Sequence, residues 1–248
     1  MRVNLVLSGG AVRGVAHIGV IKALEELGFE ISAISGVSAG ALVGAFYCDG
    51  YTPEEMLRIV KSRDWLKYLR PTLPRLGLIS LREAGRYLSG MLSVQHIEDM
   101  KRKLFIAVVD IKTGKSLYFE EGSLITLLLG SCALPGIFEP IRYQDYLLID
   151  GGLTNNLPVE PLLSKDGLLV GVDVNPNVSV ERIGSIFHII LRSFLLAVRS
   201  SVDKRKEVCH VVIEPELYNY SPFNLTRADE IYRLGYEKTL QVMKPYAK

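Results

Sequence analysis

The sequence lacks a charge bias, a cysteine framework and a cluster of metal-binding side chains. Its 248 residues carry 29 Lys and Arg against 27 Asp and Glu, a formal net charge of +2, which is too small to indicate nucleic-acid binding. The three cysteines are widely spaced, without a C-x-x-C pair, so we expect no disulfides and a reducing compartment. No Asp/Asn-rich loop of the calcium-binding kind is present. We therefore expect neither a metal nor a cofactor.

Long apolar runs are also missing. No uncharged apolar stretch reaches the roughly 18 residues that a membrane span requires. The nearest candidate, residues 186–198, contains Arg192, and we expect a core helix there rather than an interfacial or oligomer-forming one. The apolar run before Gly9 is too short for the core of a signal peptide. The sequence thus predicts a cytoplasmic protein, either soluble or peripheral at the inner membrane surface, and indicates no oligomeric state.

Short apolar runs alternate with helical patterns in what remains. With 48% hydrophobic and 23% charged residues, the composition is typical of an ordered globular protein. We expect strands near residues 3–7, 31–36, 104–109, 117–119, 146–149, 168–174 and 208–213. We expect helices near residues 15–27, 39–47, 53–63, 124–129, 182–201 and 227–246. The sequences from Thr52 to Glu55 and from Ser80 to Glu83 are typical of capping boxes. The alternation predicts a mainly parallel sheet with helices on both faces, in one domain over residues 1–248.

Residues 36–40, GVSAG, form a G-x-S-x-G motif between a predicted strand and a predicted helix. In this context Ser38 occupies a sharp, strained turn, and Gly36 and Gly40 leave room for the crossing strand and helix. The helix N-terminus favours the negative charge that develops at such a serine. A glycine-rich turn without chemistry explains the motif about as well by itself. Two further motifs favour catalysis.

Residues 8–14, SGGAVRG, lie between the first predicted strand and the first predicted helix. A glycine-rich loop at this place exposes backbone N–H groups to an anion. A dinucleotide fingerprint would need glycine where Ala11 stands and an acidic residue after the second strand, and the P-loop lysine is absent. An oxyanion hole fits better. Arg13 would either neutralise its charge or brace the loop, which ends at Gly14.

Residues 146–152, YLLIDGG, place Asp150 at the end of a predicted strand, before Gly151 and Gly152. We expect a carboxylate there to project toward the catalytic end of the sheet, where it could serve as a base for Ser38. An ordinary Asp-Gly turn is the alternative and, for this motif alone, the better one.

A histidine could still complete a triad with Ser38 and Asp150. The chain contains His17, His96, His188 and His210. The order Ser38, Asp150, then His188 or His210 is allowed in α/β-hydrolases. However, His210 lies within a predicted strand and His188 within an apolar predicted helix, whereas a catalytic histidine usually lies on a loop. A triad remains the less favoured alternative, because triads are recognised by geometry.

Together and in this order, the three motifs resemble those of the patatin-like phospholipase family. Residues 16–20, AHIGV, residues 131–138, SCALPGIF, and residues 150–158, DGGLTNNLP, are similar to its bacterial branch. The resemblance extends from Met1 to about Pro215.

The resemblance implies a three-layer α/β/α sandwich and a catalytic dyad without histidine. Ser38 would be the nucleophile and Asp150 the base. The oxyanion hole would consist of Gly9, Gly10 and Ala11. The supporting positions would be Arg13, Gly14, Gly36, Gly40, Gly151 and Gly152. Ala11 replaces a third glycine; its amide survives the change, but whether it can adopt a positive φ is left open.

Basic and apolar residues are mixed along residues 58–78. The basic ones are Arg58, Lys61, Arg63, Lys67, Arg70 and Arg75, with Asp64 as the acidic exception. Trp65, Leu66, Tyr68, Leu69, Leu73 and Leu76 lie between them, and Pro71 and Pro74 disfavour a helix. Such a segment could contact an anionic membrane surface or cover the active site. Inward packing of its apolar side chains is the favoured alternative.

The expected activity is hydrolysis of fatty-acyl esters of lipids or phospholipids, of phospholipase A or lysophospholipase type. The expected partner is therefore a lipid or ester substrate, and no nucleic acid. An acyltransferase or a thioesterase using the same dyad is one alternative. A lipid-binding regulatory protein with little turnover is another, which the intact motif set disfavours.

Overall fold

The structure is a computed structural model, and it describes residues 1–72, 76–175 and 184–247. The strands are β1 (Arg2–Leu7), β2 (Glu30–Val37), β3 (Arg70–Pro71), β4 (Ile79–Ser80), β5 (Lys103–Asp110), β6 (Lys115–Phe119), β7 (Ile141–Tyr143), β8 (Tyr146–Asp150), β9 (Leu168–Val172) and β10 (Val211–Ile213). The α-helices are α1 (Val15–Glu26), α2 (Ala39–Asp49), α3 (Pro53–Ser62), α4 (Arg82–Met91), α5 (Leu124–Cys132), α6 (Ile186–Lys206) and α7 (Ala228–Met243). The 3-10 helices are η1 (Ala11–Gly14), η2 (Asp64–Tyr68), η3 (Ile97–Asp99), η4 (Gly151–Leu153), η5 (Glu160–Leu162), η6 (Leu225–Arg227) and η7 (Lys244–Tyr246).

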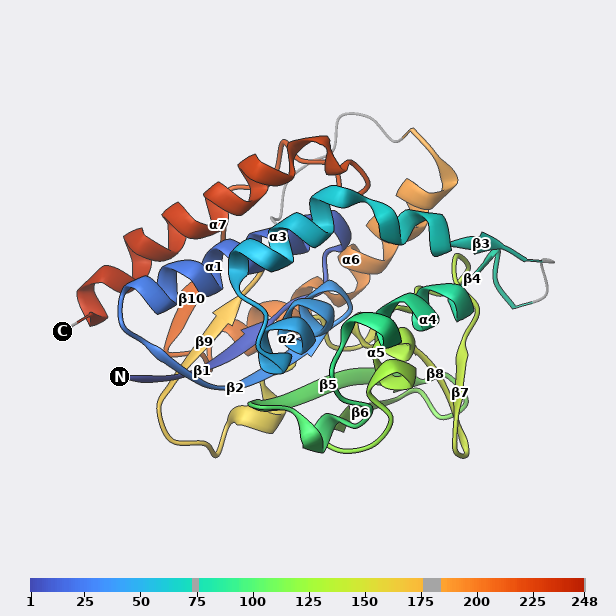
Figure 1. Ribbon diagram of the computed structural model, residues 1–248, viewed down its shortest axis with the longest axis horizontal. Helices are drawn as coiled ribbons and strands as arrows, with labels where there is room; N and C mark the ends of the chain where they lie inside the picture. Colours follow the sequence, from blue (N-terminus) through green and yellow to red (C-terminus); the bar gives the residue numbers. More distant parts are fainter. Residues whose placement is uncertain (73–75, 176–183, 248) are drawn as a thin grey trace.

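The central sheet is mixed and mostly parallel (Figure 1). In the described part of the chain it has eight strands, ordered β10-β9-β1-β2-β5-β8-β7, with β6 also paired to β5. The five strands from β10 to β5 run parallel, whereas β6 and β8 pair antiparallel with β5, and β7 with β8. A separate two-stranded hairpin is formed by β3 and β4.

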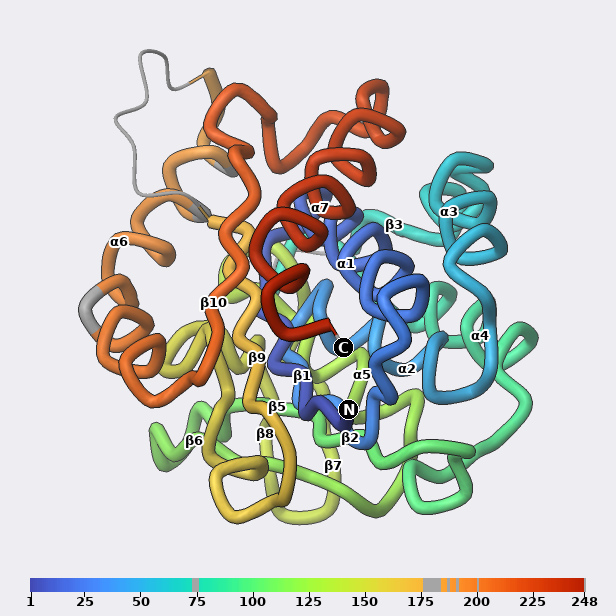
Figure 2. The backbone as a smooth tube through the Cα atoms, turned by 90° about the vertical axis from the view of Figure 1, so that its left-hand side faces the viewer, coloured from blue at the N-terminus to red at the C-terminus, as the bar shows by residue number. Residues whose placement is uncertain are grey.

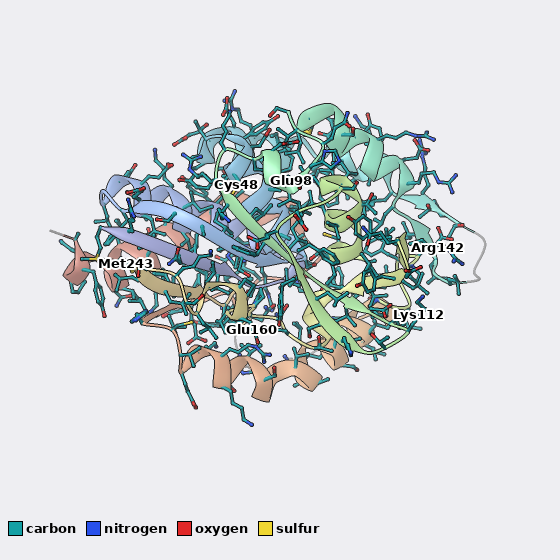
Figure 3. The ribbon with its side chains drawn as sticks, turned by 90° about the horizontal axis from the view of Figure 1, so that it is seen from below. Cys48, Glu98, Lys112, Arg142, Glu160 and Met243 are labelled. Carbon is teal, nitrogen blue, oxygen red and sulfur yellow. The ribbon has the colours of Figure 1, made fainter. Side chains whose placement is uncertain are left out.

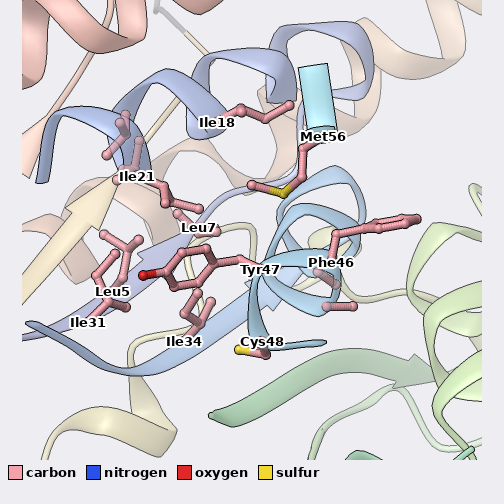
Figure 4. Close-up of a cluster of buried hydrophobic side chains, with 14 of the residues drawn as sticks. Leu5, Leu7, Ile18, Ile21, Ile31, Ile34, Phe46, Tyr47, Cys48 and Met56 are labelled. Atoms are coloured by element: carbon pink, nitrogen blue, oxygen red, sulfur yellow. The ribbon is translucent and has the colours of Figure 1, made fainter. Parts of the chain in front are cut away.

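Helices cover both faces of the sheet because side chains alternate along its strands. Leu5 and Leu7 of β1 join a large core with α1, α2, α3, α5 and α7, whereas Val6 joins a second core with Val198 and Val202 of α6. Figure 4 shows the first core, with α1 above β1 and β2 and the Met56 side chain of α3 pointing between α1 and α2. The predicted three-layer α/β/α fold is confirmed.

The outer helices are fixed by specific contacts. On one face α7 lies beside α1 (Figure 2), so close that a Cβ on Gly235 would stand 2.1 Å from the Ala16 carbonyl oxygen. On the other face Figure 3 shows α6 running below the sheet, next to the labelled Glu160. Arg205 of α6 forms an ion pair with Glu160 at 2.7 Å.

Local capping chemistry explains several helix ends. The predicted capping box at Thr52 is confirmed, because its Oγ1 accepts from the Glu55 amide at 3.3 Å and Glu55 accepts from the Thr52 amide at 2.8 Å. The box predicted at Ser80 is wrong. Ser80 is paired with Arg70 in the β3–β4 hairpin, so α4 begins only at Arg82, without a side-chain cap.

The predictions for the C-terminal third need three corrections. The strand predicted at 208–213 is restricted to Val211–Ile213. The helix predicted at 182–201 runs from Ile186 to Lys206; its predicted start at residues 182–183 lies outside the described residues. The core helix predicted over residues 186–198 is buried on one side only, since Ile186 is 65% exposed and Ile189 51%. Among the helices that the structure describes, none has the length and apolar character needed to span a membrane.

Candidate active site

Ser38 occupies the sharp turn between β2 and α2. Its backbone has φ 53° and ψ −123°, a strained conformation for a residue with a side chain. The neighbouring backbones approach closely: a Cβ on Gly40 would stand 2.4 Å from the Leu7 carbonyl oxygen, and one on Gly36 2.7 Å from the Ala41 nitrogen. The two glycines of the motif therefore make the turn possible. As the N-cap of α2, Ser38 also stands at the positive end of the helix dipole.

Ser131 holds the strained turn in place. Its hydroxyl accepts a hydrogen bond from the Ser38 amide at 2.8 Å and donates one to the Ala107 carbonyl at 2.7 Å. The side chain is fully buried in α5. Sequence reasoning gave Ser131 no role; the only signal was its place at the start of the SCALPGIF segment.

Asp150, at the end of β8, lies level with Ser38 although β8 runs opposite to the parallel strands. Val37, just before Ser38, pairs with Ala107 of β5, and Asp150 pairs with the next residue, Val108. Because β8 runs antiparallel to β5, Asp150 arrives at this level from the direction opposite to that of the parallel strands. The carboxylate comes level with Ser38 because β5 extends beyond β2 and β8 returns along that extension. A Cβ on Gly151 would stand 2.5 Å from the Ala107 carbonyl oxygen, so glycine permits this approach.

The Ser38 hydroxyl lies close enough to the Asp150 carboxylate to lower the pKa of its carboxyl group. The Asp150 residue is only 4% exposed, and this burial raises the pKa of its carboxyl group to about 7. The interaction with the Ser38 hydroxyl and the hydrogen bond from the Gly152 amide, at 2.9 Å, lower that pKa by less than burial raises it. The Cys132 thiol also interacts with Ser38, and burial raises the pKa of this thiol, so it stays protonated. Asp150 is thus the group near Ser38 that can exchange a proton near neutral pH.

The glycine-rich loop presents two amides to the site. The Gly9 amide donates to Asn156 Oδ1 at 3.2 Å, so it is not available as the oxyanion donor that the sequence suggested. The amides of Gly10 and Ala11 make no hydrogen bond to any residue that the structure describes. Ala11 has φ 50°, which answers the question left open by its replacement of glycine. Two loop amides, rather than three, are free to bind an anion.

Asn156 lies between the glycine-rich loop and the Asp150 turn. Besides accepting from the Gly9 amide, its Oδ1 would stand 2.6 Å from a Cβ on Gly152. On the other side of the loop, Asn175 Nδ2 donates to the Gly9 carbonyl at 2.6 Å. The two asparagines clamp Gly9 from both of its polar groups. Sequence reasoning assigned them no role, although Asn156 lies in the quoted DGGLTNNLP segment.

Arg13 braces the loop from behind. Its Nε donates to the Tyr220 carbonyl at 2.8 Å, and burial, followed by the nearby Arg192, lowers the pKa of Arg13 to about 10. The side chain faces a small secondary pocket and does not line the cavity at Ser38. Gly14 packs on α2, since a Cβ there would stand 2.6 Å from the Ala39 Cβ. Of the two alternatives for Arg13, the structure favours bracing.

A cavity of about 800 Å³ opens beside these groups. Ser38, Asp150 and residues 9–11 line it together. Most of its remaining wall is apolar and comes from α1, α2, α3, η2, α4, α5 and α6, including Ile18, Leu42, Val43, Phe46, Met56, Trp65, Leu88, Leu128 and Phe194. Such a wall accommodates an apolar chain.

The histidines lie elsewhere. None of the four lines the cavity. His17 is buried beneath the glycine-rich loop and its Nε2 bonds to the Ser8 carbonyl at 2.8 Å, and His210 accepts from the Leu169 amide at 2.9 Å. His188 packs against Phe223, and His96 lies beside Asp99 on the surface. A histidine between Ser38 and Asp150, the alternative considered from the sequence, is not found.

The segment over residues 58–78 divides between the interior and the surface. Trp65, Leu66 and Leu69 line the cavity. Part of the segment therefore packs inward, which was the alternative to membrane contact. Leu76 and Leu78 are 61% and 41% exposed. Residues 73–75, with Leu73, Pro74 and Arg75, lie outside the described residues.

Comparison with known proteins identifies one matching protein family and several relatives. A family model of patatin-like phospholipases matches residues 5–163. An uncharacterised NTE family protein of Mycobacterium bovis is 30% identical over 218 residues, which cover 82% of this chain and 61% of that protein. Lysophospholipase NTE1 of Scheffersomyces stipitis is 25% identical over 279 residues, which cover 99% of this chain and 18% of the yeast protein. The chain thus spans less than two thirds of the length of these relatives.

A solved structure with a similar fold is VipD from Legionella pneumophila. It superposes with a TM-score of 0.58 at 16% identity, covering 98% of this chain and 66% of VipD. At this identity the likeness concerns the fold.

Proposed function

Because this chain belongs to the patatin-like phospholipase family, we propose that it is a serine acyl hydrolase that cleaves fatty-acyl esters of lipids. Ser38 is the nucleophile and Asp150 the base, acting without histidine. The observation that carries the proposal is the meeting of these two side chains at the wall of an apolar cavity, beside the unpaired amides of Gly10 and Ala11.

Acylation begins when Asp150 accepts the Ser38 proton and Ser38 Oγ attacks the ester carbonyl carbon. The carbonyl oxygen becomes an oxyanion, which the Gly10 and Ala11 amides stabilise. Removing one such donor costs on the order of 3 kcal/mol in other hydrolases. Asp150 then gives its proton to the leaving alkoxide, and an acyl-Ser38 ester remains.

Deacylation reverses the roles. Asp150 takes a proton from water as the water oxygen attacks the acyl carbon, and the same two amides hold the second oxyanion. When the intermediate collapses, the fatty acid leaves and the proton on Asp150 returns to Ser38 Oγ. A carboxylate with a pKa of about 7 suits this exchange, because a base is most effective when its pKa lies near the working pH.

The apolar cavity supports a lipid acyl chain as the group that is recognised. We further propose that residues 1–248 act as one hydrolase domain and that the segment over residues 58–78 contacts a membrane surface. The relatives support a lipid substrate by name, since one of them is called a lysophospholipase. The unpaired amides favour turnover over the alternative of a binding protein with little activity.

The test compares Ser38→Ala and Asp150→Asn with the native protein on a water-soluble p-nitrophenyl ester. We expect each variant to lose roughly 10³-fold or more in kcat, as loss of a nucleophile or base does in serine hydrolases. Ser164→Ala is the matched control, because Ser164 is exposed and makes no hydrogen bond in the described part of the chain.

A fluorophosphonate probe gives a second readout. Labelling should occur at Ser38 and disappear in Ser38→Ala, while Ser164→Ala should be labelled like the native protein. Near-native turnover of either dyad variant would overturn the mechanism. A native protein that neither reacts with the probe nor hydrolyses esters would instead favour a lipid-binding protein.

A further inference from the structure

Exposed residues mark the mouth of the cavity. Among the residues that line it, Arg63 after α3, Leu66 in η2, Ser185 before α6 and Phe223 before α7 are themselves exposed. Segments from three distant parts of the sequence therefore meet at one opening. Leu66 is 42% exposed and Phe223 47%, so the opening has an apolar edge.

Further large apolar side chains are exposed next to this edge. Leu76 and Leu78 of the β3–β4 hairpin are 61% and 41% exposed, and Ile186 and Ile189 in the first turn of α6 are 65% and 51% exposed. We call these four, with Leu66 and Phe223, the rim surface. Monomeric soluble proteins rarely expose large apolar patches without a binding partner.

Packing joins the parts of the rim surface into one unit. A small core beneath it combines Ile79 of β4 with Ile190 and Phe194 of α6. The His188 ring of α6 packs edge-on against the Phe223 ring, with 6.3 Å between centroids. In Figure 1 the hairpin and the start of α6 lie at the same end of the molecule, away from both termini. The hairpin, the start of α6 and the segment with Phe223 are therefore joined by packing beside the opening.

The fold itself gives no reason for these apolar side chains. The buried side of α6 packs on the protein through Phe194 and Val198, which are 7% and 4% exposed. A surface helix normally carries polar residues on its other side, yet Ile186 and Ile189 stand there in solvent. The apolar outer face thus indicates a partner.

Charge indicates what that partner is. Between residues 58 and 72 the chain carries Arg58, Lys61, Arg63, Lys67 and Arg70 against Asp64. Lys61 and Lys67 form ion pairs with Asp229 and Asp64, so the three arginines supply the positive charge. Basic residues beside exposed apolar ones are the combination that binds an anionic lipid surface. A second copy of the chain is the less suitable partner, because a two-fold interface would bring the same basic residues of both copies together.

We propose that the rim surface docks the protein on an anionic lipid bilayer, with the cavity mouth facing the membrane. The proposal rests on the lipid hydrolase function proposed above and adds how substrate arrives. An acyl chain that leaves the bilayer through an apolar edge enters the cavity without crossing water, which removes the cost of exposing it. The start of α6, expected from the sequence to be a core helix, supplies two of the six residues of this surface.

The test uses two double variants, Ile186→Glu with Ile189→Glu, and Leu76→Glu with Leu78→Glu. None of these four residues lines the cavity. The matched control is Ile111→Glu with Leu163→Glu, two residues outside the rim surface that are 47% and 55% exposed. Binding is measured by co-sedimentation with vesicles of phosphatidylcholine alone and of phosphatidylcholine with phosphatidylglycerol, and folding by circular dichroism.

We expect the native protein and the control to bind the anionic vesicles. Each rim variant should bind them at least roughly tenfold more weakly, because it loses apolar contact and gains negative charge. All should hydrolyse a water-soluble short-chain ester at the native rate. Hydrolysis of vesicle lipid should fall with binding in the rim variants alone.

Three results would overturn the docking surface. The native protein would not co-sediment with anionic vesicles, the rim variants would bind them as tightly as the control does, or the native protein would be a dimer that the rim substitutions convert to a monomer. Failure of the proposed function is distinguishable. In that case the native protein would bind vesicles through the rim surface and yet hydrolyse no ester, including the soluble one.

Discussion

Replacing Asp150 by asparagine should stabilise the fold at alkaline pH while it removes activity. Burial raises the pKa of the Asp150 carboxyl group from 3.8 to about 7. The unfolded chain, in which the group is hydrated, loses this proton near the ordinary value, well before the native state does. As the pH rises between these two pKa values, the unfolded state therefore gains relative to the native state, and the native protein loses stability.

The size of the loss follows from the pKa difference. About three units correspond to about 4 kcal/mol in total, at about 1.4 kcal/mol per unit. The cost is small at pH 4, grows through the interval and is complete above about pH 7, so that about 2–3 kcal/mol develops between about pH 5 and pH 8. Asparagine keeps an oxygen for the Gly152 amide and carries no charge, so the variant avoids this cost.

Urea unfolding at several pH values measures the effect. The free energy of unfolding of Asp150→Asn minus that of the native protein should rise by about 2–3 kcal/mol from about pH 5 to pH 8, and the subtraction cancels the other titrating groups. Asp145→Asn, the same substitution at an exposed carboxylate, is the matched control. A flat difference for Asp150→Asn would refute the reasoning, because it would mean that the carboxyl group is not desolvated in the native state.

Three further outcomes are expected. The same pKa predicts that kcat/KM for a soluble ester falls as the pH drops through about 7, because a protonated Asp150 cannot act as a base; a pH profile that stays level down to the ordinary range of a carboxyl group would contradict this. Asn156→Ala removes the acceptor of the Gly9 amide and should lower kcat roughly 10–100-fold with little change in KM, so an unchanged kcat would show that the loop keeps its shape unaided. Ala11→Val places a β-branched residue at φ 50° and should lower kcat at least about tenfold, whereas Ala11→Gly should retain native turnover; equal activities of the two variants would mean that this backbone angle is not required.

Several features could be predicted from neighbouring residues alone. The helix predicted near residues 15–27 ends as expected: Gly28, the next residue, has φ 76°, its amide donates to the Glu25 carbonyl and the Phe29 amide donates to the Leu24 carbonyl. The capping box at Thr52 and the turn at Ser38 are likewise set by residues within a few positions of each other. Such predictions succeed because the conformational preferences of glycine and the reach of short polar side chains act locally.

Predictions that depended on strand partners were less secure. The capping box at Ser80 failed because pairing with Arg70 in the hairpin extends the strand to that residue. Asp150 does line the cavity with Ser38, but through an antiparallel strand that the sequence did not reveal. Strand direction depends on which distant segment supplies the pairing partner, and the pattern of a short apolar run does not record it.

By itself, the sequence determined the local backbone of this protein, namely where strands give way to helices and where a serine and an aspartate stand next to glycines, because those choices depend on adjacent residues. Only the tertiary structure decided what surrounds them. Asn156 occupies the Gly9 amide, burial raises the pKa of Asp150, and α6 turns isoleucines toward solvent beside the cavity mouth. Desolvation, hydrogen-bond competition and exposure all arise from residues far apart in the chain, so they exist only once the chain has folded.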